Sequence, residues 1–206
     1  MEGNNIPLAQ LWRGRRIVLV FLRHFGCIFC HKLMKSIVEV YPKFQQADVS
    51  VVCISIGSPA TAKHFQAKWG FKGEIYVDQS PKEAFIYKLF GLPSSPFNLR
   101  PAPGSGVEAA GSHGFRKDVY KAWMRAQEVD HLDASLDIRS EELDFQADMR
   151  QIGGTFVLGP GNTCDFAFRE TYAGHLPPLQ RVIAAATGKE EEQDYIYPST
   201  KVSTRY

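Results

Sequence analysis

The chain has 206 residues, of which 44% are hydrophobic and 22% charged, so it can bury one substantial core with an additional insertion or tail. A formal net charge of +2 gives no electrostatic basis for binding nucleic acid or a membrane surface. The longest apolar run, residues 17–22, is far shorter than the roughly 20 residues of a membrane span. Since no leader pattern precedes this run, the sequence predicts a cytoplasmic protein.

The first 91 residues predict three consecutive strand-helix units. The predicted strands are residues 17–22, 49–56 and 74–77, and the predicted helices are residues 28–44, 59–70 and 81–90. The first strand is apolar throughout, which indicates burial on both faces. Ser58-Pro59 and Ser80-Pro81 each pair an N-cap residue with a proline at the first helical position. This alternation predicts an α/β protein whose mainly parallel sheet is covered by helices on both faces.

The second half begins with an insertion at about residues 92–150. Its first part, 92–114, is rich in proline and glycine, and 115–129 and 141–149 could form helices. Two antiparallel strands, 154–158 and 164–168, are predicted around a short turn, followed by a helix at 179–186. We therefore expect a single domain over residues 1–188 and a C-terminal tail over residues 189–206.

Two cysteines, Cys27 and Cys30, follow the first predicted strand. At the start of a helix, unpaired backbone N–H groups and the helix dipole lower the pKa of a thiol such as Cys27. Cys30 lies one turn further on the same face, so it could resolve a bond formed at Cys27. The flanking His24 and His31 could stabilise a thiolate by charge or transfer a proton, and Arg23 and Arg169 are candidates for a neighbouring positive charge.

Other interpretations of the cysteines are weaker. Cys27 to His31 also fits the pattern that attaches a c-type haem, but the chain has no export signal. A structural zinc site needs four ligands and no second Cys-x-x-Cys exists, so no metal is expected. Cys53 lies in an apolar strand, and Cys164 is interpreted as an ordinary strand residue.

Two motifs carry a family resemblance. The first is Phe21-Leu22-Arg23-His24-Phe25-Gly26-Cys27-Ile28-Phe29-Cys30, and the second is Gly153-Gly154-Thr155-Phe156-Val157-Leu158-Gly159-Pro160-Gly161-Asn162 with Phe168-Arg169-Glu170. Together they resemble the peroxiredoxin-like 2 family of the alkyl hydroperoxide reductase and thiol-specific antioxidant group. The resemblance implies a thioredoxin-like fold, with a central mixed sheet flanked by helices, and reduction of peroxides, endoperoxides or disulfides.

The resemblance also implies roles for particular residues. Cys27 would be the attacking thiolate, Cys30 the resolving thiol, and Arg169 the favoured cation. His24 stands where typical peroxiredoxins have a threonine, and Gly153-Gly154-Thr155 stands where thioredoxins carry a cis-proline. Glycine leaves room for a substrate to approach the backbone. His24, Phe25, Gly154 and Thr155 are accordingly predicted to bind substrate.

The resulting hypothesis is a thiol-dependent oxidoreductase with a small-molecule substrate and no bound cofactor. Thioredoxin or glutathione would supply reducing equivalents that derive from NADPH, and a homodimer is compatible with the sequence. Two alternatives remain open. The insertion could adapt the scaffold to a specialised biosynthetic step, without redox chemistry, or the protein could be a non-catalytic thioredoxin-like binding module.

Overall fold

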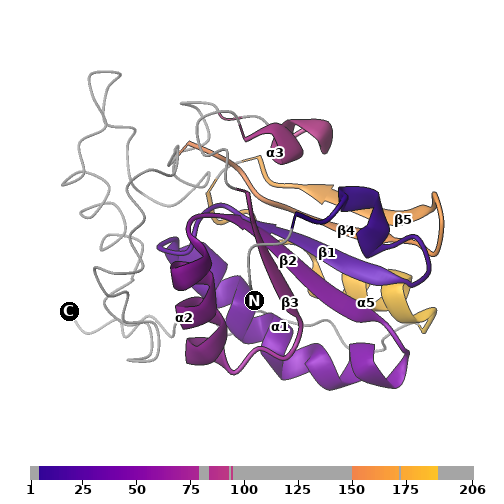
Figure 1. Ribbon diagram of the computed structural model, residues 1–206. Coiled ribbons are helices and arrows are strands. Elements are labelled where there is room, and N and C mark those ends of the chain that lie inside the picture. The colour runs from indigo at the N-terminus through magenta and orange to yellow at the C-terminus, as the bar shows by residue number, and fades with distance from the viewer. Residues whose placement is uncertain (1–4, 79–83, 93, 95–149, 172, 190–206) are drawn as a thin grey trace.

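The computed structural model describes residues 5–78, 84–92, 94, 150–171 and 173–189 (Figure 1). These residues contain a five-stranded sheet in the order β3-β2-β1-β4-β5. The strands are β1 (Ile17–Leu22), β2 (Ser50–Ile56), β3 (Glu74–Asp78), β4 (Gly154–Leu158) and β5 (Cys164–Arg169). The first three strands run parallel, whereas β4 is antiparallel to both β1 and β5. The predicted thioredoxin-like architecture, with a mixed sheet and a central first strand, is confirmed.

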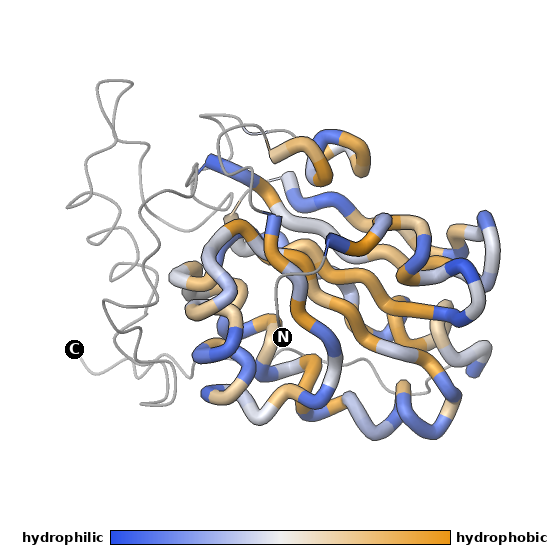
Figure 2. Tube along the Cα trace, in the orientation of Figure 1, coloured by the Kyte–Doolittle hydropathy of each residue, from blue (hydrophilic) through white to orange (hydrophobic). Residues whose placement is uncertain are grey.

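Helices cover both faces of the sheet (Figure 1). The helices α1 (Ile28–Gln46), α2 (Pro59–Trp69) and α5 (Leu179–Thr187) contribute to one hydrophobic cluster, and the short helices η1 (Leu8–Leu11) and α3 (Phe85–Leu89) contribute to the other. All six β1 residues are buried, with Val18, Val20 and Leu22 in the α1 cluster. Figure 2 shows the hydrophobic character concentrated along the central strands. No described helix combines the length and apolar character needed to cross a membrane.

The ends of α2 follow the sequence closely. The Ser58 hydroxyl accepts a hydrogen bond from the Thr61 backbone N–H at 3.1 Å, and the Thr61 hydroxyl accepts one from Ser58 N–H at 3.0 Å. Pro59 occupies the first helical position, and Gly70 ends the helix with φ of 59°. The predicted helix is confirmed. The start of the third helix at Ser80, the helices within 115–129 and 141–149, and the tail beyond Lys189 lie outside the described residues.

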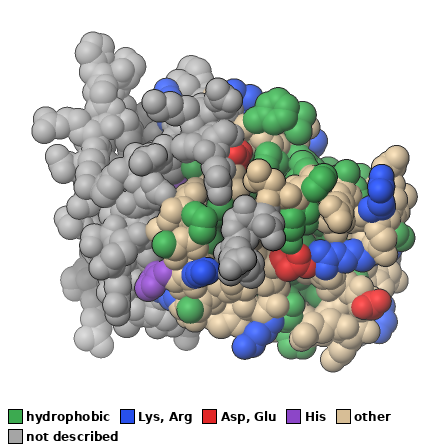
Figure 3. All heavy atoms as spheres, viewed as in Figure 1, with side chains coloured by type: hydrophobic (Ala, Val, Ile, Leu, Met, Phe, Trp, Pro, Cys, Tyr) green, Lys and Arg blue, Asp and Glu red, His purple; other side chains and the backbone are tan. Residues whose placement is uncertain are grey.

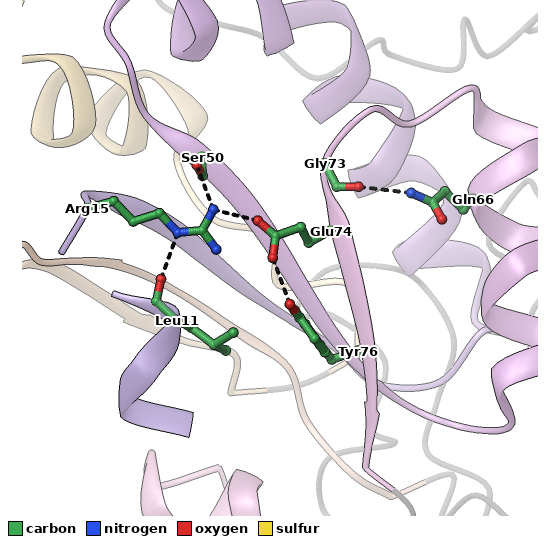
Figure 4. A network of polar contacts seen from close by, with 7 residues as sticks. All are labelled: Leu11, Arg15, Ser50, Gln66, Gly73, Glu74 and Tyr76. Atoms are coloured by element: carbon green, nitrogen blue, oxygen red, sulfur yellow. Dashed lines mark hydrogen bonds and ion pairs between the residues drawn. The ribbon is translucent and has the colours of Figure 1, made fainter. Parts of the chain in front are cut away.

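A polar network ties together the strand ends opposite the cysteine pair (Figure 4). Arg15 forms an ion pair with Glu74 at 2.6 Å and donates hydrogen bonds to Leu11 O and to the Ser50 hydroxyl. The Tyr76 hydroxyl donates to the other Glu74 oxygen at 2.7 Å. Because Arg15 precedes β1 while Ser50 and Glu74 begin β2 and β3, this network connects the starts of three parallel strands.

The helix α3 exposes hydrophobic side chains while burying others. Phe85 and Leu89 are 60% and 61% exposed, whereas Tyr87 is fully buried. In Figure 3 hydrophobic side chains gather at the top of the molecule, where Figure 1 places α3. The Tyr87 hydroxyl donates to Leu22 O at 2.5 Å and to Ile54 O at 3.3 Å. One side of α3 therefore anchors the ends of β1 and β2.

Candidate active site

The candidate site lies where β1 leads into α1. Cys27 is the N-cap residue of α1, and its backbone N–H donates to His24 O at 3.1 Å in the connecting turn. His31 N–H donates to Cys27 O at 3.0 Å, which begins the helical hydrogen bonding. Cys30 lies in the first turn. Both thiols are buried and no disulfide joins them, and they lie at the start of a helix, as the sequence predicts.

Arg23 connects the two thiols to the neighbouring strand segment. Its Nη1 donates to the Cys27 sulfur at 3.4 Å, and its backbone N–H donates to the Cys30 sulfur at 3.3 Å. Its Nε donates to Gln151 O at 2.7 Å, just before β4. The whole Arg23 side chain is buried. A buried guanidinium held in this way provides a fixed positive charge beside the Cys27 sulfur.

The environment makes the two thiols unequal. Burial opposes ionisation of Cys27, but the Cys30 hydrogen bond, the Arg23 charge and the backbone N–H groups of Cys30 and Phe29 lower its pKa to about 6. Burial and the neighbouring Cys27 raise the pKa of Cys30 well above its usual value, and Glu170 adds to this. At neutral pH the site therefore holds one thiolate, at Cys27, and one protonated thiol, at Cys30.

A buried carboxyl group also belongs to this site. Glu170 follows β5 and is 5% exposed, and its Oε2 accepts a hydrogen bond from Gly153 N–H at 3.1 Å. Burial raises the pKa of Glu170 to about 8; Arg23 lowers it and Cys27 raises it. A Cβ atom at Gly153 would overlap Phe21 O and lie 2.8 Å from Glu170 Oε1. The space left by Gly153 is thus occupied by Glu170, not open to a substrate as predicted for this glycine segment.

The two flanking histidines are neutral. Burial, Arg23 and His31 lower the pKa of His24 to about 3, and burial is the main reason that the pKa of His31 is also about 3. Trp69 Nε1 donates to His31 Nδ1 at 3.2 Å, so Nε2 carries the proton and donates it to Phe25 O at 2.7 Å. The prediction that these histidines stabilise the thiolate by charge is therefore wrong. His31 instead ties α1 to α2.

The four predicted substrate-binding residues have different environments. Phe25 is fully buried, packs against Phe65 with ring centroids 5.2 Å apart, and belongs to the core. At Gly154 a Cβ atom would lie 2.8 Å from Phe168 O and 3.0 Å from Leu92 Cδ2, so this position is filled. His24 and Thr155 are buried as well, but His24 Nε2 and Thr155 Oγ1 have no hydrogen-bond partner among the described residues.

The arginine at the thiol is Arg23, not the predicted Arg169. Arg169 is exposed, and its Nε donates to Phe90 O at 2.7 Å while its guanidinium lies 5.2 Å from the Phe156 ring centroid. The β4-β5 register pairs Arg169 with Gly154, and Phe156 belongs to the hydrophobic cluster of α3 rather than that of Cys27. Strand alternation therefore directs Arg169 to the other face of the sheet.

The remaining cysteines lie apart from the pair. Cys53 is buried in β2, where burial raises the pKa of its thiol, and Cys164 is exposed on β5. These placements agree with the interpretation of both as ordinary strand residues. Among the described residues, no group of three or more His, Cys, Asp or Glu side chains is arranged to hold a metal ion.

Sequence reasoning missed two residues of the site. Gln151 is buried, accepts from Arg23 through its carbonyl, and donates from Nε2 to Leu92 O at 2.5 Å and Ile152 O at 3.0 Å. Glu170 is part of the second sequence motif, but the sequence assigns it no role at the thiols. The available signal was the position of Glu170 directly after β5, whose antiparallel partner β4 begins at Gly154 directly after Gly153. A glycine at this point leaves room for a buried carboxyl group.

The sheet topology and the free thiols at a helix start define the general class of thiol oxidoreductases with a thioredoxin-like fold. A family model described as AhpC/TSA antioxidant enzyme matches residues 36–172. The chain belongs to this family and is an enzyme of the thiol oxidoreductase type, with a redox role in peroxide reduction. Enzymes of this type use no prosthetic group and are reduced by thiols. The matched segment begins within α1 beyond Cys30, so it does not bear on the cysteine pair.

Several curated proteins are similar over most of the chain. "Thioredoxin-like protein AAED1, chloroplastic" of Arabidopsis thaliana is 27% identical over 90% of this chain and 67% of its own length. "Peroxiredoxin-like 2C" of Homo sapiens is 28% identical over 88% of this chain and 73% of its own length. "Prostamide/prostaglandin F synthase" of Salmo salar is 28% identical over 78% of this chain and 68% of its own length. Among solved structures, Xanthomonas campestris peroxiredoxin Q matches with a TM-score of 0.49 and 15% identity, over 86% of this chain and 81% of that chain.

Proposed function

We propose that the protein reduces peroxide bonds through the Cys27-Cys30 pair. The Cys27 thiolate attacks one oxygen of an O–O bond, which breaks, so that Cys27 becomes a sulfenic acid and the other oxygen leaves as an alcohol or water. Cys30 then attacks the Cys27 sulfur, forming an intramolecular disulfide and releasing water. The observation that carries this proposal is the position of the two thiols. Cys27 is the N-cap residue of α1 and its sulfur accepts from the buried Arg23 guanidinium at 3.4 Å, whereas the Cys30 sulfur accepts from the Arg23 backbone N–H. In agreement with this, the pKa of Cys27 is lowered and that of Cys30 is raised.

Arg23, which the sequence offered as one of two candidates, takes the role for which the family resemblance favoured Arg169. Its guanidinium donates to the Cys27 sulfur and is fixed by Gln151 O, so it stabilises the thiolate before the attack. The same charge can stabilise the negative charge that develops on the leaving oxygen. Arg23 is therefore our candidate for the cation of the active site.

His24 and Thr155 are our candidates for contacts with the peroxide. A buried polar atom without a partner costs free energy, which a bound ligand can recover. Thr155 lies opposite Val20 in the β1-β4 register, and Val20 belongs to the hydrophobic cluster that contains both cysteines. The Thr155 hydroxyl and the neutral His24 imidazole could each donate to, or accept from, an oxygen of the substrate.

The O–O bond could belong to a hydroperoxide or to an endoperoxide. Relatives named prostamide/prostaglandin F synthase favour testing an endoperoxide as the second candidate. The same thiol chemistry applies: attack by Cys27 opens the bond, and resolution by Cys30 leaves two hydroxyl groups on the product. A disulfide substrate would require attack at sulfur, and thioredoxin or glutathione would then return the enzyme to the dithiol.

The test is turnover of hydrogen peroxide, cumene hydroperoxide and a stable bicyclic endoperoxide, with thioredoxin or glutathione as the reductant. We expect Cys27→Ser to abolish turnover of every substrate, and Cys30→Ser to stop at a sulfenic acid that a cyclic 1,3-diketone can trap. The exposed Cys164→Ser is the matched control and should retain wild-type rates. Peroxide reduction that survives in Cys27→Ser would overturn the proposal.

A further inference from the structure

The side-chain amide of Gln151 is a buried polar group to which the mechanism above assigns no role. Gln151 is 1% exposed, and its Nε2 donates hydrogen bonds to Leu92 O at 2.5 Å and to Ile152 O at 3.0 Å. The carbonyl oxygen of the same residue accepts from Arg23 Nε at 2.7 Å. Gln151 therefore binds two backbone carbonyl groups through its side chain and the active-site guanidinium through its main chain.

The regular sheet does not hold the Gln151 carbonyl group in place. The β1-β4 register ends where Phe21 lies opposite Gly154. Arg23 and Gln151 both lie beyond this pair, and residues 152–153 belong to no strand. Outside a strand a peptide group is not held by the hydrogen bonds of a continuous ladder, so the direction of this carbonyl group depends on other contacts.

The Gln151 side chain fixes its own carbonyl group from two sides. Its bond to Ile152 O closes a ring around the peptide group between Gln151 and Ile152, so a rotation of this peptide group breaks the bond. Its bond to Leu92 O attaches the ring to α3, because the buried Leu92 donates its N–H to Tyr87 O at 3.0 Å. An antiparallel bridge between Ser94 and Gln151 joins the two segments a second time. The carbonyl oxygen is thereby held towards the guanidinium.

The position of the guanidinium matters because it contacts the thiol over a long hydrogen bond. Arg23 Nη1 lies 3.4 Å from the Cys27 sulfur. Since the guanidinium is a rigid plane, the bond at Nε helps to set where Nη1 points. A displacement of the plane would lengthen the distance between the positive charge and the sulfur, and the attraction between them falls with distance.

We propose that Gln151 is a positioning residue of the active site: its side-chain amide holds the carbonyl oxygen that keeps the Arg23 guanidinium against the Cys27 sulfur. This inference rests on the proposed function, in which that sulfur attacks the substrate. Gln151 itself touches neither the thiols nor the reacting oxygen atoms in this mechanism, and it acts through Arg23.

The test is the pH dependence of Cys27 alkylation by iodoacetamide in the reduced full chain, followed by peptide mass spectrometry. Gln151→Met keeps the length of the side chain but has no donor, and Gln151→Asn keeps an amide should Gln151→Met fail to fold. Gln66→Met is the matched control, because Gln66 Nε2 also donates to a backbone oxygen, that of Gly73, at 2.9 Å (Figure 4). Each variant is also made in the Arg23→Met background, and circular dichroism verifies folding.

We expect Gln151→Met to slow alkylation about two- to fivefold at pH 6 but not at pH 9, where the thiol is ionised in both proteins. Gln151→Asn should shift the profile in the same direction, because its shorter side chain does not reach both carbonyl oxygens. Gln66→Met should match the wild type. In the Arg23→Met background Gln151→Met should change the profile no further, since residues that act through one another are not additive.

A wild-type alkylation profile in Gln151→Met, or in Gln151→Asn if only this variant folds, would overturn the inference. An effect of Gln151→Met that is equally large with and without Arg23 would also overturn it, because a general structural effect does not depend on the arginine. Peroxide turnover of the wild type is measured separately. Its absence would overturn the proposed function, while the alkylation profiles would still decide whether Gln151 positions Arg23.

Discussion

The two ends of the central sheet carry polar groups of the same types in opposite circumstances. At one end, Arg15 and Glu74 are 41% and 34% exposed, and their charges satisfy each other directly (Figure 4). At the other end, Arg23 and Glu170 are buried together with Cys27 and Cys30. Arg15 lowers the pKa of Glu74 despite its partial burial, whereas burial raises that of Glu170 to about 8. The exposed arginine and glutamate thus connect neighbouring strands, whereas the buried arginine and glutamate lie at the cysteine site, where burial shifts the pKa of the carboxyl group.

The largest effect should come from closing the space that Glu170 occupies. Gly153→Ala would bring a Cβ atom into Phe21 O and Glu170 Oε1, and overpacking of this kind costs about 3 kcal/mol. Gly14→Ala is the matched control at the opposite end, because its Cβ would meet nothing within 4 Å. Urea unfolding should show a large decrease in the free energy of unfolding for Gly153→Ala and almost none for Gly14→Ala. Equal stability of the two variants would contradict the described geometry.

The next effect concerns the positive charge at the thiol. Arg23→Met should raise the pKa of Cys27 by about one unit or more, because removal of a nearby opposite charge shifts a pKa on that scale. At pH 6, alkylation of Cys27 by iodoacetamide should then slow by about fivefold or more. Arg15→Met should leave the alkylation rate unchanged. The pH dependence of alkylation, followed by peptide mass spectrometry, distinguishes the two arginines; an unchanged Cys27 profile in Arg23→Met would refute its role.

The sequence predicted the sheet far better than the surroundings of the thiols. Uninterrupted apolar runs and the Ser58-Pro59 cap follow from local chemistry, so the strands and α2 were found. The positions of Arg169 and Glu170 relative to Arg23 depend on two pairings, that of β5 with β4 and that of β4 with β1, and the second joins residues as far apart in sequence as Phe21 and Gly154. One residue of register decides which face of the sheet a side chain takes, and this is why Arg169 was assigned to the wrong side.

A pH-dependent effect separates the buried histidines from ordinary ones, and it is absent at neutral pH. In the folded protein His24 and His31 each have a pKa of about 3, below the usual 6.5, so the unfolded chain binds more protons between these values. Stability should therefore fall as the pH decreases from about 6.5 toward 3, by at most about 1.4 kcal/mol per pH unit for each histidine. Proton NMR of the imidazoles should show no titration of either residue above pH 5. A midpoint near pH 6.5 would contradict this.

The smallest effect is expected at the exposed network. Glu74→Gln removes an ion pair between half-exposed side chains, and such pairs contribute less than about 1 kcal/mol. The loss should shrink further in concentrated salt, because salt screens exposed charges. Urea unfolding at low and high salt measures both quantities. If Glu74→Gln lowered the free energy of unfolding by several kcal/mol and salt did not alter this decrease, the ion pair would behave as a buried one, which would contradict its exposure.

The central claim is that Cys27 is the thiolate that attacks and Cys30 the thiol that resolves. Its most direct test is peptide mass spectrometry of the reduced protein after one equivalent of cumene hydroperoxide, with and without dimedone. The account predicts a Cys27-Cys30 disulfide when dimedone is absent, a dimedone adduct on Cys27 in Cys30→Ser, and no modification of Cys53. A first oxidation product on Cys30 or Cys164, with Cys27 left as a free thiol, would contradict it.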